Sequence, residues 1–149
     1  MIHPRFLTYS VVLASLLAVS ACNTSPMTSN VSTLTARLSA ANEVPAASSN
    51  GSGTLSANLD KATSVLSWTV TYSNLSGPVT AGHFHGPAKI GQNAGVALPF
   101  KDSLESPIRG TASLTPAQVD AVMNGNWYVN LHTAANPGGE IRGQVSLYP

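Results

Sequence analysis

Apolar side chains recur at every second position through most of this chain, and this period constrains the fold more than any other feature. Leu34, Ala36, Leu38 and Ala40 alternate with polar residues, and later segments repeat the pattern. Successive side chains of a strand point to opposite faces, so the pattern is typical of half-buried β-strands. Gly, Pro and Asn separate the segments. Eight strands are expected, near residues 34–40, 53–59, 65–72, 80–85, 95–100, 108–114, 127–133 and 141–148.

One segment departs from the period of two. Thr115 is a suitable N-cap, Pro116 suits the first helical position, and Gln118 completes a capping box. Gly125 can supply the left-handed residue that ends a helix. The sequence therefore predicts one helix of two to three turns, with a structural role, before the penultimate strand.

Eight short strands in a chain of 149 residues favour a single all-β domain. Regularly spaced turns between short strands are typical of an antiparallel β-sandwich or barrel. The single short helix does not indicate an α/β protein, in which strands and long helices would alternate.

The first 21 residues have the three parts of a secretory signal peptide. Arg5 lies in a short polar start, residues 11–19 are apolar, and Ser20 and Ala21 are small. The apolar run is shorter than the roughly 20 residues that a membrane-spanning helix needs. Residues 17–21 and the following Cys22 resemble the lipobox at which bacterial lipoproteins are lipidated and cut.

We therefore expect an exported protein, anchored to a bacterial membrane through lipidated Cys22 and facing the periplasm or the cell exterior. Cys22 is the only cysteine of the chain, so it cannot form an internal disulfide. The expected organisation is a signal peptide over 1–21, the lipidated cysteine and a flexible tether over 22–31, and a β-domain over 32–149.

The balance of charge excludes one class of partner. Arg5 is one of seven basic side chains, so residues 22–149 carry equal numbers of basic and acidic side chains. Proteins that bind nucleic acid depend on clustered Lys and Arg to neutralise phosphates. No nucleic-acid partner is expected.

The histidines after the signal peptide lie in two short segments. His83 and His85 are separated by one residue, so on a strand they project from the same face about 6–7 Å apart. His132 follows Tyr128 and Asn130 at the same spacing. Three convergent imidazoles would suit copper or zinc. A His-x-His pair alone is a weak signal, because isolated histidines are often hydrogen-bonded structural residues.

Five short motifs follow one another along the chain in a specific order and spacing. They are residues 42–45 (NEVP), 81–88 (AGHFHGPA), 114–118 (LTPAQ), 128–133 (YVNLHT) and 136–144 (NPGGEIRGQ). Together these motifs resemble the CHRD (chordin-type) domain family over about residues 34–148. The resemblance implies an extracytoplasmic β-sandwich, found in animal chordin and in small bacterial exported proteins. A distant likeness of this family to Cu/Zn superoxide dismutase implies a Greek-key arrangement and the ligand set His83, His85 and His132.

Other polar residues are expected to support the site rather than catalyse a reaction. The turn at 136–139 should bring Glu140 near His132, where Glu140 or Asn130 would orient an imidazole. Glu140 and Arg142 alternate on one strand and are expected to make structural hydrogen bonds or ion pairs. No serine-nucleophile motif and no recognisable acid–histidine spacing is present. The sequence supports no assignment of an enzymatic reaction.

Three functions from different classes follow. The first is a lipid-anchored envelope protein that binds a metal ion, copper in preference to zinc, and it requires the three histidines to converge. The second is a structural or interaction module without a metal, whose surface binds an envelope protein or a glycan. The third, a dismutase-like enzyme, is the least favoured, because the chain has neither the cysteine pair nor the extra His and Asp cluster of that enzyme.

Overall fold

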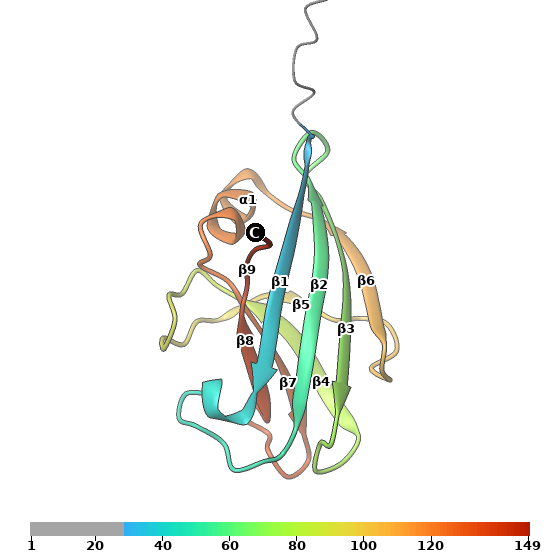
Figure 1. Cartoon of the computed structure of the whole chain (residues 1–149), viewed down its shortest axis with the longest axis vertical. Helices are drawn as coiled ribbons and strands as arrows, with labels where there is room; N and C mark the ends of the chain where they lie inside the picture. The colour runs from blue at the N-terminus through green and yellow to red at the C-terminus, as the bar shows by residue number, and fades with distance from the viewer. Residues whose placement is uncertain (1–28) are drawn as a thin grey trace, which may run out of the picture.

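A computed structural model describes residues 29–149, which form one antiparallel sheet that curls around a core (Figure 1). The predictions for the signal peptide, for Cys22 and for most of the tether lie outside the described residues. The strands are β1 (Val31–Ser39), β2 (Ser52–Asp60), β3 (Val65–Ser73), β4 (Val79–His85), β5 (Val96–Pro99), β6 (Ile108–Ser113), β7 (Tyr128–Thr133), β8 (Ile141–Gln144) and β9 (Ser146–Leu147). A 3-10 turn, η1 (Ala40–Asn42), follows β1.

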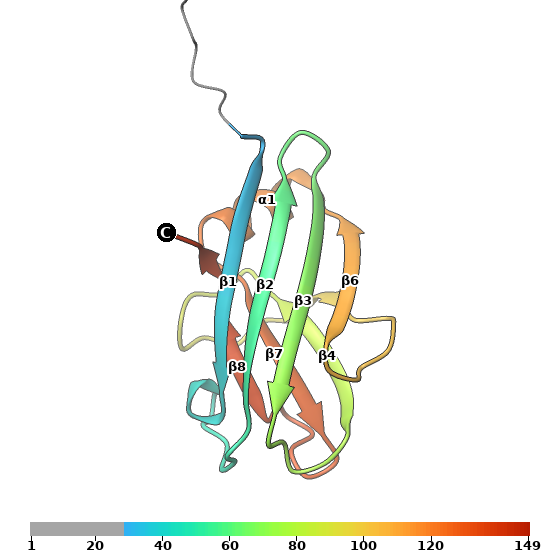
Figure 2. The same ribbon diagram turned by 45° about the vertical axis from the view of Figure 1, so that its right-hand side comes forward.

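The sheet has the order β5-β4-β7-β8-β1-β2-β3-β6, with β9 paired to β1. In Figure 2, β1, β2, β3 and β6 form the near layer, and β4, β7 and β8 lie behind them. Few strand pairs connect the two layers. β1 pairs with β8 only at Ser39 and Arg142, and the middle of β1 pairs with β9. The all-β antiparallel prediction is confirmed.

The core lies between the two layers and follows the period of two. Leu34, Ala36 and Leu38 of β1 are buried, and their polar neighbours face outward. Phe84 and Leu131 reach the same core from the opposite layer. Complete burial of such a side chain contributes about 1.5–3 kcal/mol to the free energy of folding. This single shared core holds the curled sheet together despite its short central ladder.

The predicted helix is α1 (Pro116–Met123), at one end of the sheet between β6 and β7 (Figure 1). Thr115 Oγ1 accepts a hydrogen bond from the backbone N–H of Gln118, and Gln118 Oε1 accepts one from the backbone N–H of Thr115. Gly125 has a φ of 69°, the left-handed conformation expected after the helix. Gln118 Nε2 also donates to the carbonyl oxygen of Ala97, which ties the helix to β5.

The last predicted strand, 141–148, forms as two strands instead of one. Val145 lies between β8 and β9, and its N–H donates to the carbonyl oxygen of Trp127. Gly143 precedes this break, and a side chain there would overlap the backbone of Arg37 in β1. The sheet therefore has nine strands instead of the eight expected.

No helix within residues 29–149 has the length and apolar character needed to cross a membrane.

Candidate metal centre

The pairing of β4 with β7 brings the three histidines to one place. His83 and His85 flank buried Phe84 and therefore project from the outer face of β4. His132 of β7 is diagonal to His83, because His83 pairs with Asn130 and Ala81 pairs with His132. Diagonal neighbours on one face of an antiparallel pair are within reach of long side chains.

The facing nitrogens of the three imidazoles are close together. His83 Nδ1 lies 3.2 Å from His132 Nε2. One ring nitrogen of each histidine, including His85, lies within 4.8 Å of the other two. The convergence required by the metal-binding hypothesis is therefore confirmed.

Backbone carbonyl groups determine which ring nitrogen carries the proton in two of the three histidines. His85 Nδ1 lies 3.0 Å from the carbonyl oxygen of Ala94, and His132 Nδ1 lies 2.9 Å from that of Pro137. A carbonyl oxygen only accepts, so each Nδ1 carries the proton and each Nε2 presents a lone pair. Both rings are thus oriented as metal ligands commonly are, with the remote N–H held by the protein.

Asn130 lies between the two Nε2 atoms. Its side chain is buried, and Oδ1 is 3.1 Å from His85 Nε2 and 3.1 Å from His132 Nε2. The expected contact between Asn130 and the imidazoles is present. Within residues 29–149, the site gathers three imidazoles and one amide oxygen, and no carboxylate joins the group of converging ligand atoms.

The environment favours unprotonated imidazoles. Burial lowers the pKa of His83, and the neighbouring His132 and His85 lower it further. Burial also lowers the pKa of His85, although the oxygens of Ala94 and Asn130, which would accept hydrogen bonds from a protonated ring, oppose the effect. Neutral imidazole is the form that binds metal ions, so both rings are in that form at neutral pH.

These histidines lie within a recognised domain. The family model of the CHRD domain matches residues 34–145, which is most of the chain. The chain belongs to the CHRD domain family. No curated protein and no solved structure matched the chain. The resemblance expected from the sequence motifs is confirmed, and all three histidines fall inside the matched part of the CHRD domain.

A stack of planar groups supports His85 in this CHRD domain. The rings of His85 and Tyr128 are parallel, with centroids 4.7 Å apart and an interplanar angle of 4°. The guanidinium of Arg142 lies 3.4 Å from the centroid of the Tyr128 ring. Arg142 was expected to support the site, and it does so by stacking on Tyr128, a contact that no spacing rule in the sequence indicated.

The loop between β4 and β5, residues 86–95, folds over the same outer face. Arg142 donates to Asn93 Oδ1 at 2.8 Å and to the carbonyl oxygen of Gln92 at 2.6 Å. Gln144 donates to the carbonyl oxygen of Ala88. The loop covers the His85 side of the site, and His83 and His132 stay half-buried.

Glu140 does not contact the histidines, and the expectation that it would orient an imidazole is corrected. Its fully buried carboxylate accepts hydrogen bonds from Ser49, Ser76 and Thr133. Thr133 alternates with His132 along β7 and so points to the opposite face. Burial alone would raise the pKa of Glu140, but these hydrogen bonds lower it to about 2.

Glu43 is a neighbour of the site whose role the sequence did not assign. Its side chain is 8% exposed, and Oε1 has no hydrogen-bond partner among the described residues. Burial raises the pKa of Glu43 to about 7, although the charge of Arg142 and a hydrogen bond from Asn130 oppose the shift. The only sequence signal for Glu43 was its place in the NEVP motif.

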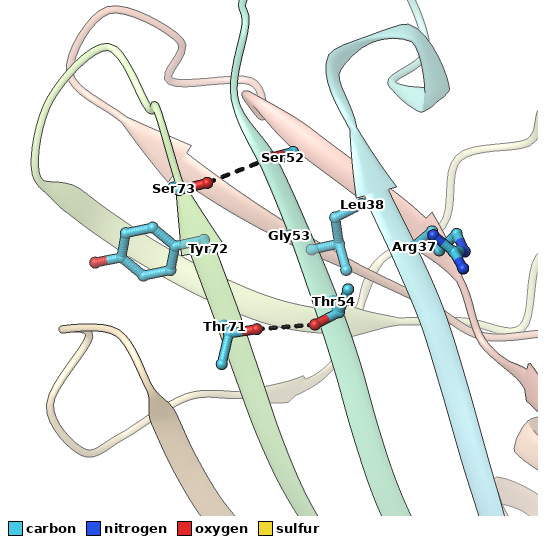
Figure 3. Close-up of a pocket in the computed structure, with 8 residues that line it drawn as sticks. All are labelled: Arg37, Leu38, Ser52, Gly53, Thr54, Thr71, Tyr72 and Ser73. Atoms are coloured by element: carbon cyan, nitrogen blue, oxygen red, sulfur yellow. Dashed lines mark hydrogen bonds between the residues drawn. The ribbon is translucent and has the colours of Figure 1, made fainter.

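A hollow elsewhere on the domain has no comparable chemistry. It has a volume of about 540 Å³ and lies on the outer face of β1, β2 and β3 (Figure 3). Pairs of hydroxyl groups bond to each other there, Thr54 to Thr71 and Ser52 to Ser73. None of the described histidines or carboxylates lines it. The hollow is a solvated sheet face, whereas the histidine cluster is the candidate site.

Proposed function

We propose that this CHRD-domain protein binds a copper ion through His83, His85 and His132. The observation that carries the proposal is the convergence of one ring nitrogen from each of the three histidines within 4.8 Å, beside the buried amide of Asn130. His85 Nε2 and His132 Nε2 are lone-pair atoms because their Nδ1 protons are donated to carbonyl oxygens. Asn130 Oδ1, also an acceptor, lies 3.1 Å from both.

Acceptors at this separation repel one another unless a proton or a cation lies between them. The N–H of His83 Nδ1 can satisfy His132 Nε2, at 3.2 Å, but it does not satisfy His85 Nε2. One cation bound by all the facing atoms would satisfy the whole cluster. The donor set is therefore that of a cation site.

Three of the separations are those of a small transition-metal site. With bonds of about 2.0–2.1 Å, adjacent ligand atoms are about 3.3–3.4 Å apart in a tetrahedron and about 2.8–3.0 Å apart in a square plane. The pairs His83–His132, His85–Asn130 and His132–Asn130, at 3.1–3.2 Å, lie between the two, and the other histidine pairs lie within 4.8 Å. A flattened four-coordinate site suits copper, and a tetrahedral one suits zinc.

Copper is preferred over zinc because imidazole-rich sites bind divalent copper more tightly than divalent zinc. The half-buried His83 and His132 leave a side of the site accessible to an incoming ion. Zinc is the alternative ion.

The proposal includes the location of the protein. Met1–Ala21 would direct export, and lipidation of Cys22 would anchor the domain to a bacterial membrane, facing the periplasm or the exterior. What supports this part is the sequence alone: the three-part leader and a single cysteine directly after small residues.

The test is a calorimetric titration of Cu(II) into the Cys22→Ser protein, which removes both the lipid and a competing thiol. We expect one equivalent to bind tightly, and the affinity to fall at least about 100-fold in the His83→Ala/His85→Ala variant. Titration with Zn(II) under the same conditions should give weaker binding.

The matched control is Thr71→Ala/Ser73→Ala, which removes two outward side chains at the same spacing from β3. This control should bind copper like the parent protein. Each variant is compared with the parent by thermal unfolding without metal, so that a folding defect is recognised. Equal copper affinity in the parent and the folded histidine variant would refute the proposal and favour the interaction-module alternative, with a protein or glycan partner.

A further inference from the structure

We propose that the side-chain oxygen of Asn130 is a fourth ligand of the metal, and that Glu43 is the positioning residue that turns this oxygen toward the histidines. The inference rests on the proposed function, and it assigns the two residues roles that neither the family match nor the His-x-His spacing supplies.

The first step is the place of Asn130. It pairs with His83 across the β4–β7 ladder and with Arg142 across the β7–β8 ladder, so it sits at the centre of the outer face. Its side chain is 3% exposed. A buried amide oxygen 3.1 Å from two imidazole nitrogens occupies the position of a further ligand of the same ion.

The second step is the orientation of the amide. An asparagine presents an acceptor on one side and two donors on the other, and either orientation has the same shape. Oδ1 lies 3.1 Å from His85 Nε2 and from His132 Nε2, so the NH₂ group points the other way, toward the Glu43 side chain. A negatively charged Glu43 favours this orientation, because its oxygens attract the NH₂ group and repel Oδ1.

The third step is what holds Glu43 in place. Its carboxylate lies against Gly139, where any side chain would overlap Oε1. Gly139 has a φ of 129°, a conformation that other residues rarely adopt. The charge of Arg142 also acts on the carboxylate. The glutamate of the NEVP motif and the second glycine of the NPGGE motif thus meet behind the site.

This arrangement also strengthens the amide oxygen as a ligand. A carboxylate that accepts the amide N–H polarises the amide and makes its oxygen more negative. Outer contacts of this kind commonly change metal affinity by 10–100-fold. Glu43 would act on the ion through Asn130 without touching it.

The experiment compares Cu(II) affinity and electron paramagnetic resonance spectra of the Cys22→Ser protein with three variants of it. Asn130→Ala should weaken binding at least about tenfold, since the oxygen is lost. Asn130→Asp should keep the affinity within about threefold or raise it, and should lower g∥ because a charged oxygen enters the coordination sphere. Glu43→Gln should weaken binding about tenfold, because its own NH₂ group lets the Asn130 amide turn over.

Glu105→Gln is the control, because it removes an exposed carboxylate in the loop between β5 and β6. It should leave affinity and spectrum unchanged. A parent protein that binds copper through its histidines, with Asn130→Ala within twofold of it and Asn130→Asp unchanged in g∥, would overturn this inference alone. A parent protein without histidine-dependent copper binding would overturn the proposed function and this inference together. If Asn130→Ala does not fold, the g∥ of Asn130→Asp decides.

Discussion

Replacing Glu140 by Gln should destabilise the domain by about 2–3 kcal/mol at pH 7 without changing its affinity for copper. The carboxylate is fully buried. It accepts four hydrogen bonds, from Ser49 Oγ at 2.6 Å, Ser76 N at 2.7 Å, Ser76 Oγ at 2.6 Å and Thr133 Oγ1 at 2.5 Å. These contacts join the loops after η1 and β3 to the end of β7.

The magnitude follows from what the substitution keeps. The backbone N–H of Ser76 cannot turn away, so it keeps its hydrogen bond by donating to the side-chain oxygen of the glutamine. The hydroxyls of Ser76 and Thr133 can turn to accept from the new NH₂ group. What is lost is the charge of the acceptor, and bonds to charged groups contribute about 1.5–3 kcal/mol against about 1 kcal/mol for neutral ones. The two hydroxyl bonds that turn over lose about 1–4 kcal/mol together, and the middle of that range is the expected 2–3 kcal/mol.

The loss of stability in Glu140→Gln should become smaller as the pH falls. The pKa of Glu140 is lowered to about 2 in the folded protein from an ordinary value of 4.5. The stabilisation by its charge is therefore complete above pH 4.5 and is lost as the pH falls toward 2. The contribution of Glu43 to the pH dependence of stability has the opposite sign, because a raised pKa favours the folded protein at low pH. Both proteins contain Glu43, so this contribution cancels when their free energies of unfolding are compared.

Urea unfolding of the parent protein and of Glu140→Gln, at pH 7 and again near pH 2.5, measures the difference directly. We expect about 2–3 kcal/mol at pH 7 and a clearly smaller difference in acid. Glu105→Gln, on the surface, should cost less than about 0.5 kcal/mol. A loss below 0.5 kcal/mol for Glu140→Gln, or a loss that is the same at both pH values, would refute the reasoning. A change in copper affinity would contradict the placement of Glu140 away from the histidines.

Three further predictions concern the metal and the anchor. Copper at 100 times its dissociation constant should stabilise the domain by about 2.7 kcal/mol, seen as a higher unfolding temperature that His83→Ala/His85→Ala lacks. Because burial lowers the pKa of His83 and His85 from 6.5, acid should protonate these two ligands, and so weaken copper binding through them, at a lower pH than it would two ordinary histidines; titrations at several pH values measure this, and protonation of the two rings already above pH 6.5 would contradict the lowered values. A labelled fatty acid should be incorporated into the parent protein and not into Cys22→Ser, and label in the variant would exclude this cysteine as the anchor.

Local sequence signals predicted the elements of this fold well. The period of two predicted the strands because alternate side chains of β1 to β3 face the core. The capping box predicted the start of α1 because Thr115 and Gln118 satisfy each other's backbone groups. The break at Val145 was missed, because the bond of its N–H to Trp127 and the pairing of β9 with β1 are contacts between segments that are distant in the chain.

The site was predicted only in part, for a related reason. The i, i+2 spacing places His83 and His85 on one face, but only the pairing of β4 with β7 adds His132. The carbonyl groups of Ala94 and Pro137 fix the tautomers, and backbone groups carry no signature in the sequence. Glu140 was placed wrongly because a turn brings the residue back without determining which face its side chain joins.

The most direct test of the copper site is pulsed electron paramagnetic resonance of the Cys22→Ser protein loaded with one equivalent of Cu(II). We predict modulation from three coordinated imidazoles, reduced to one in His83→Ala/His85→Ala. A spectrum from fewer than two imidazoles in the parent protein, or one that the double variant leaves unchanged, would contradict the account.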